Sequence, residues 1–180
     1  MVSASAPDTL VDYLSGRPIP DVGAEKNRQA VIRYLIDTAG YERGDISAGV
    51  PITLTIGPAQ YRSTVDLVVT LDEAPLMVVK CAAGSLGSRE REALAAARLL
   101  YKRPVPLSAV TDGESATLLA SASGRKIISA DLSVLPTRPR LRAMAETYPT
   151  QPLSETQRHR ESLIFRSYDS MNINVARGHA

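Results

Sequence analysis

Three charged side chains stand out because each lies in or beside an apolar stretch: Glu25, Asp66 and Lys80. Asp66 interrupts the run 64–71, whose β-branched residues predict a strand, and Lys80 comes near the end of the apolar run 76–81. Antiparallel pairing across the short turn between these runs would place position 66 near positions 80–81. A charge in such a setting is costly unless it is paired or bound to a cation. The pattern therefore predicts an Asp66–Lys80 ion pair at one end of a sheet, or a cation site there.

Glu25 begins the first strong helical pattern, which we predict over residues 24–39. Gln29 and Ile32 follow it at helical spacing, and Arg28 lies at the edge of the same stripe. The polar start of an otherwise buried face therefore points toward the sheet. Two interpretations stay open: a carboxylate that belongs to a site on the sheet, or a first-turn acid that favours the helix dipole and pairs with a nearby arginine.

The remaining pattern alternates between helical and extended stretches. The run 76–81 is apolar on both faces, so we expect it to be a central strand. A serine at position 88 is the expected N-cap of the second strong helix, and Ser154 with Gln157 forms a capping box for the last one. Helices are predicted at 9–14, 24–39, 89–101, 140–148 and 154–171, and strands at 50–56, 64–71, 76–81, 107–111, 116–121 and 126–128.

Composition limits the function classes. The 180 residues, 44% of them apolar, suffice for one domain with a core, and a net charge of +2 creates no overall field for nucleic acid. The charge is uneven, because residues 136–180 hold seven arginines against four acidic residues. This basic C-terminal region indicates either a surface that contacts phosphate or a solvated helix face.

Location also follows from composition. Cys81 is the single cysteine, which favours a reducing compartment. The N-terminus lacks the pattern of a signal peptide, and no apolar run approaches the ~20 residues that a membrane helix needs. We therefore expect a soluble, cytoplasmic protein that does not contact a membrane.

An ordered set of short motifs carries a family resemblance over roughly residues 10–130. The pieces are RPIP at 17–20, EKNRQ at 25–29, GY at 40–41, VDLVV at 65–69, LMVVKCA at 76–82, the helix through 92–100 and VTDG at 110–113. With these pieces in this order and spacing, the chain resembles the N-terminal nuclease domain of type I restriction enzyme R subunits, within the PD-(D/E)xK nuclease-like superfamily.

The resemblance implies an α/β fold of the restriction-endonuclease type: a central mixed β-sheet flanked by helices, with its site at the sheet edge near the first helix. We expect this domain to occupy residues 1–130. Residues 131–180 would then form a linker and a C-terminal helical appendage.

The resemblance also implies roles for particular residues. In that family a helix acid, a strand aspartate and a Glu-x-Lys motif hold Mg²⁺ and position the attacking water. Carried over, Glu25 and Asp66 are metal-ligand candidates and Lys80 is the catalytic-lysine candidate, so that all three form the predicted catalytic set. Arg28 and Gln29, on the helix of Glu25, are the expected contacts to nucleic acid.

One position departs from the family pattern. The glutamate of the motif is replaced by Val78, which cannot bind Mg²⁺. Glu92, on the following helix, is the third metal-ligand candidate because it could restore the lost carboxylate. Glu90 is the competing replacement, and ordinary helix-surface charge explains both residues equally well.

The preferred hypothesis is therefore a degenerate nuclease-like protein that binds nucleic acid, DNA before RNA, with weak or no Mg²⁺-dependent hydrolysis. An active Mg²⁺-dependent endonuclease that uses Glu90 or Glu92 is one alternative, so enzyme status stays open. A non-enzymatic interaction scaffold is the other. The helix 154–171 carries a narrow apolar edge of Leu163, Ile164 and Tyr168, which could pack on the core, on a second copy or on a partner protein.

Overall fold

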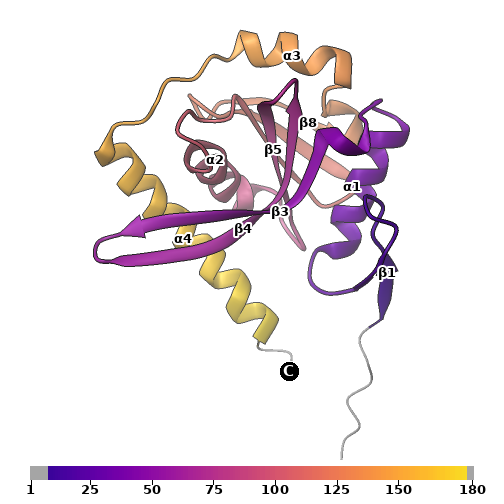
Figure 1. Ribbon diagram of the computed structural model, residues 1–180, viewed down its shortest axis with the longest axis horizontal. Helices are drawn as coiled ribbons and strands as arrows, with labels where there is room; N and C mark the ends of the chain where they lie inside the picture. Colours follow the sequence, from indigo (N-terminus) through magenta and orange to yellow (C-terminus); the bar gives the residue numbers. More distant parts are fainter. Residues whose placement is uncertain (1–7, 178–180) are drawn as a thin grey trace, which may run out of the picture.

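A six-stranded mixed β-sheet organises the protein, as a computed structural model that describes residues 8–177 shows (Figure 1). The strands lie in the order β3-β4-β5-β6-β7-β8, with β5 and β6 parallel and the other neighbours antiparallel. The prediction of a mixed sheet is confirmed. The bounds are Ile46–Ile56 (β3), Ala59–Leu71 (β4), Ala74–Cys81 (β5), Leu107–Thr111 (β6), Ser115–Ala120 (β7) and Lys126–Asp131 (β8).

Strand β5 is central, as its apolar sequence predicts. Met77, Val78 and Val79 are fully buried, because helices cover both faces of the sheet at this strand. Antiparallel pairing with β4 sets Leu67 opposite Val79 and Val68 opposite Val78. The tight turn between the two strands holds its residues at positive φ.

Helices form a layer on each side of the sheet. Helix α1 (Glu25–Asp37) and helix α3 (Arg138–Thr147) pack on the face that contains Met77, Val79 and Cys81. Helix α2 (Glu90–Leu99) packs on the opposite face, against Val68 and Val78. Since alternate residues of a strand point to opposite faces, Lys80 shares the α2 face and Cys81 shares the α1 face.

The C-terminal helix α4 (Glu155–Arg177) lies across α2 and the β3–β4 hairpin (Figure 1). Its predicted start is confirmed: the Ser154 backbone N–H donates to Gln157 Oε1, and the Gln157 N–H donates to Ser154 Oγ. Phe165 is 2% exposed and packs with α2 residues and the hairpin. The Arg98 guanidinium of α2 meets the buried Glu161 carboxylate of α4 at 2.8 Å. The helix is longer than the predicted 154–171.

Two local predictions were wrong. Residues 9–14 form no helix: β1 (Thr9–Val11) pairs with β2 (Pro18–Pro20), and the Asp12 carboxylate accepts hydrogen bonds from Leu14 and Ser15 in the turn between them. Such side-chain bonds compete with helix formation. Ser88 is not the N-cap of α2, because it lies within a 3₁₀ turn, Gly87–Arg89, that precedes the helix.

Candidate functional site: a paired ion cluster at the end of β5

The Lys80 ammonium lies between two carboxylates from different elements. Its Nζ is 3.3 Å from Asp66 Oδ2 on β4 and 3.0 Å from Glu92 Oε1 on α2. The predicted proximity of Asp66 and Lys80 is therefore observed, and Glu92 joins them. We call Asp66, Lys80, Glu92 and Arg89 the ion cluster, because Arg89 NH1 contacts the second oxygen of Glu92 at 3.2 Å.

Burial makes this pairing necessary. The Glu92 side chain is 1% exposed although it lies in the first turn of a helix, and the Lys80 side chain is 16% exposed. Burial by itself lowers the pKa of Lys80, but the neighbouring Asp66 and Glu92 outweigh it and raise that pKa above its usual value. Lys80 therefore carries its positive charge at neutral pH.

Asp66 and Glu92 each accept a further hydrogen bond from a group other than Lys80. The backbone N–H of Cys81 donates to Asp66 Oδ2 at 2.7 Å, which fixes the carboxylate at the end of β5. Arg89 holds Glu92 from one helical turn earlier on the chain. Sequence reasoning missed Arg89, although its i, i+3 spacing to Glu92 is typical of a helical ion pair.

Glu90 takes a different direction from Glu92. Its carboxylate meets the Lys126 ammonium of β8 at 2.8 Å, and its side chain is 23% exposed. Of the two glutamates considered as replacements for the motif acid, only Glu92 contacts Lys80. Val78 is fully buried in the core beneath α2, away from solvent.

Glu25 is held within its own helix rather than by the ion cluster. Its carboxylate meets Arg28 NH2 at 2.6 Å and accepts from Gln29 Nε2 at 2.8 Å. Gln29 is buried and also bonds to the β1–β2 turn through Asp12 and the Tyr13 backbone. The structure thus brings together Asp66, Lys80 and Glu92, and separately Glu25, Arg28 and Gln29.

The ion cluster and the group formed by Glu25, Arg28 and Gln29 both flank the end of β5. Burial raises the pKa of the Cys81 thiol, and the charges of Asp66 and Glu25 add to the shift while Lys80 and Arg28 oppose it. Cys81 packs on the α1 face, whereas Lys80 lies on the α2 face. The two polar groups therefore approach the same strand end from opposite sides of the sheet.

The donor set does not fit a divalent cation as it stands. Mg²⁺ needs oxygen ligands that are available to it, and the facing oxygens of Asp66 and Glu92 are already bound to the Lys80 ammonium. Two cations, Lys80 and Arg89, balance the two carboxylates. Within residues 8–177, no group of three or more histidine, cysteine or acidic side chains is placed to hold a metal.

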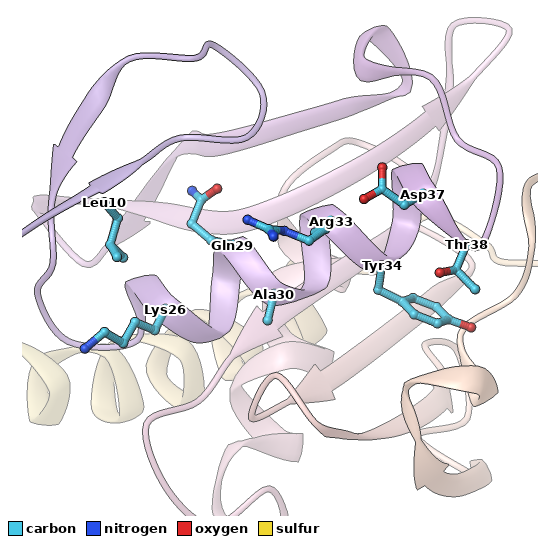
Figure 2. A pocket seen from close by; sticks show the side chains of 8 residues that line it. All are labelled: Leu10, Lys26, Gln29, Ala30, Arg33, Tyr34, Asp37 and Thr38. Atoms are coloured by element: carbon cyan, nitrogen blue, oxygen red, sulfur yellow. The ribbon is translucent and has the colours of Figure 1, made fainter.

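A groove of about 570 Å³ runs along the outer side of α1 (Figure 2). Leu10 of β1 faces the helix there, and Lys26 and Arg33 supply positive charge. The Lys26 ammonium is paired with Asp21 at 2.7 Å. The ion cluster is not part of this groove, whose lining comprises Leu10, Lys26, Gln29, Ala30, Arg33, Tyr34, Asp37 and Thr38.

Comparison with known proteins identifies one family. Residues 23–136 match the family model described as type I restriction enzyme R protein N terminus. The matched segment includes α1, the whole sheet and all four residues of the ion cluster. Searches of the curated proteins and of the solved structures found no match to the chain. In the part of the chain that the structure describes, no helix combines the length and apolarity needed to cross a bilayer.

Proposed function

Because the chain belongs to the family of type I restriction enzyme R protein N termini, we propose that it is a restriction-nuclease-like protein that binds nucleic acid and hydrolyses it weakly or not at all. One observation carries the second part: the Lys80 ammonium lies within 3.3 Å of Asp66 and 3.0 Å of Glu92. Asp66 and Glu92, the candidate metal ligands, are both paired with the Lys80 ammonium instead.

The chemistry explains why this pairing opposes catalysis. Metal-assisted phosphodiester hydrolysis requires a cation that polarises the phosphate and lowers the pKa of the attacking water. An ammonium supplies hydrogen bonds and one charge, but it cannot coordinate a water molecule. In addition, the bonds that Lys80 makes to Asp66 and Glu92 are bonds that it cannot offer to a nucleophile or to a phosphate.

Exposed arginines support the nucleic-acid part of the proposal. Arg140 on α3, and Arg160 and Arg166 on α4, are exposed. Arg28 is partly exposed beside Glu25, near the end of β5. Guanidinium groups suit phosphate oxygens because they offer paired N–H donors in a fixed plane. Duplex DNA is the proposed ligand.

A second candidate function is an active Mg²⁺-dependent nuclease. The observation in its favour is that Glu92 reaches the position beside Lys80 and Asp66, where it could replace the carboxylate lost at Val78. This alternative requires Lys80 to leave the carboxylates when substrate and metal arrive. The matched pair Glu92→Gln and Glu90→Gln distinguishes it, since Glu90 lies against β8.

The test combines cleavage with binding. Supercoiled plasmid is incubated with the full chain and Mg²⁺ or Mn²⁺, and duplex DNA is titrated at several salt concentrations. The proposal expects slow nicking at most, and DNA binding that weakens with a slope of about 0.9 in log K per log salt for each phosphate contacted. Nicking that Glu92→Gln abolishes and Glu90→Gln retains would establish the active alternative. Absence of binding at low salt would refute the nucleic-acid proposal.

The binding surface has its own control. Replacing both Arg160 and Arg166 by Gln removes two exposed charges of α4 that are remote in sequence from the ion cluster. If these groups contact phosphate, the salt slope should fall by about 2. An unchanged slope would place the nucleic-acid surface elsewhere on the molecule.

A further inference from the structure

The outer part of the β3–β4 hairpin, residues 50–65, has a polar face that the ion cluster does not involve. We call this part of the hairpin the arm. We propose that the arm lies in the major groove of duplex DNA and that its exposed face contacts the edges of the bases. This inference rests on the proposed function, since it requires a protein that binds DNA, and it assigns the surface that makes the contact.

The arm has one buried face and one exposed face. On the buried face, Ile52 and Leu54 are 3% exposed and pack with Phe165 of α4. The Tyr61 hydroxyl donates to Asp169 Oδ2 of α4 at 2.6 Å. Because these contacts hold the arm along α4 (Figure 1), the opposite face of the arm has a fixed position.

The exposed face consists of three cross-strand pairs: Pro51 with Thr64, Thr53 with Arg62, and Thr55 with Gln60. Apart from the proline, these side chains are hydroxyl, amide and guanidinium groups, all of which can donate hydrogen bonds. No acidic residue occurs between positions 46 and 65. A polyanion can therefore approach this face without meeting a carboxylate of the arm.

Positive charge lies on the arm and beside it. Arg62 is exposed on the arm itself. Arg166 of α4 is also exposed, and its guanidinium lies 6.0 Å from the centre of the Tyr61 ring. The nearby Asp169 carboxylate is buried against Tyr61, on the other side of the arm from its exposed face. The charge around the exposed face therefore complements that of phosphate groups.

The dimensions of the arm select the groove. The major groove of B-form DNA is about 12 Å wide and admits a two-stranded β-ribbon, whose strands lie about 4.8 Å apart. Residues 50–56 span about 20 Å at the rise of a β-strand, so the arm is long enough to cross several base pairs. The major groove of A-form RNA is too deep and narrow for side chains to read, which makes duplex DNA the expected ligand.

The side chains of the exposed face suit base edges. A guanidinium such as that of Arg62 can donate two hydrogen bonds to guanine O6 and N7, and an amide such as that of Gln60 can bond to adenine N6 and N7. Since Arg62 and Gln60 are two residues apart on one strand, they lie about 6.6 Å apart, close to the length of two base-pair steps. The arm should therefore give the protein a sequence preference.

The first test compares two exposed arginines by titration of the full chain with duplex DNA, including the duplex that it selects from a random pool. Arg62→Gln changes the arm, and Arg125→Gln is the matched control beside β8, at the opposite edge of the sheet. We expect Arg62→Gln to weaken binding to the selected duplex by about 5- to 150-fold and to relax the preference at one base pair. Arg125→Gln should change the affinity by less than about 2-fold. Arg166→Gln should lower the salt slope by about 1 and leave the preference unchanged.

The second test locates the arm directly. Cys81, the single cysteine, is buried, so Thr55→Cys adds one accessible thiol that can carry a photoreactive group. We expect this label to cross-link to bound duplex DNA. The same label on Ser123→Cys, in the exposed turn before β8, should not. Both substitutions are at exposed positions, and an unchanged midpoint of thermal unfolding checks that each variant is folded.

Three results would overturn the inference and leave DNA binding itself in place. One is a parent that binds duplex DNA while Arg62→Gln binds it as tightly as Arg125→Gln does, which would put the DNA surface elsewhere. The second is a label on Thr55→Cys that cross-links to a second copy of the chain instead of to DNA. The third is equal binding of duplex RNA of the same sequence, which would exclude the major groove. A parent that binds no DNA at low salt would refute the proposed function and this inference together.

Discussion

Replacing Phe165 by Ala tests whether α4 is part of the folded core. Phe165 is 2% exposed and packs against the α2 face of the sheet, together with residues of the β3–β4 hairpin. Truncating a buried phenylalanine costs about 3–5 kcal/mol, from the lost transfer free energy and the cavity that remains. For a chain of this size that corresponds to a fall in the unfolding midpoint of roughly 6–20 °C.

The assay is urea unfolding followed by circular dichroism, with Leu163→Ala as the matched control on the same helix. Leu163 is 43% exposed, so its truncation should change the free energy of unfolding by less than about 1 kcal/mol. Equal, small effects of the two substitutions would refute the reasoning, because they would mean that α4 does not bury Phe165 in solution. A change in the slope of the unfolding curve would indicate instead that the variant separates α4 from the sheet before the rest unfolds.

Two further predictions concern how the elements around the site are held. Gly113→Ala should lower the free energy of unfolding by about 2 kcal/mol or more, because φ is +94° and the new Cβ would lie 3.0 Å from the Asn27 backbone of α1. Gly57→Ala is the control for the backbone contribution alone, because Gly57 has φ +59° and open space around it. An equal loss of stability in both variants would exclude the contact with α1. Asp45→Asn should weaken the dependence of the unfolding free energy on pH at acid pH. Burial alone would raise the Asp45 pKa, but hydrogen bonds, chiefly from Arg138 of α3, lower it below 3.8. The ionised Asp45 therefore stabilises the fold above that pH, and this stabilisation is lost as pH falls through the folded-state pKa. Unfolding curves from pH 7 to pH 2 measure this loss of stability, and the same pH dependence in parent and variant would contradict the prediction for Asp45.

The sheet was largely predictable because its strands carry strong local signals. The run 107–111 was predicted with the bounds that the structure gives to β6, and the apolar character of 76–81 on both faces marked β5 as central. The short turn between positions 71 and 76 permitted only antiparallel pairing, which placed Asp66 beside Lys80. Pattern, turn and pairing agreed with one another, and such agreement is what allows a sequence to specify a structure.

Other features were not predictable because their signals are weak or tertiary. The buried face of α4 is mostly polar, and it includes Glu161, Ser162, Phe165 and Asp169. Hydrophobic periodicity therefore predicted an apolar edge at Leu163, which is exposed. Asp169 is satisfied by the Tyr61 hydroxyl of β4 at 2.6 Å, a contact between residues far apart in the chain. No local sequence pattern predicts such a hydrogen-bond partner.

The site shows the same limit at the level of chemistry. The position of Lys80, two residues beyond Val78, is compatible with a group that steadies a nucleophile and with a group that neutralises buried acids. An ammonium has three hydrogen-bond donors, and contacts at 3.0 and 3.3 Å direct two of them to Glu92 and Asp66, which leaves one donor for a nucleophile or a phosphate. If Lys80 moved away to a substrate, Asp66 would lose its cationic partner and Glu92 would keep only Arg89. For Lys80 to leave both carboxylates, another cation would have to take its place, and plasmid nicking by the parent, Glu92→Gln and Glu90→Gln is therefore the measurement that separates an active nuclease from an inactive protein with the same fold.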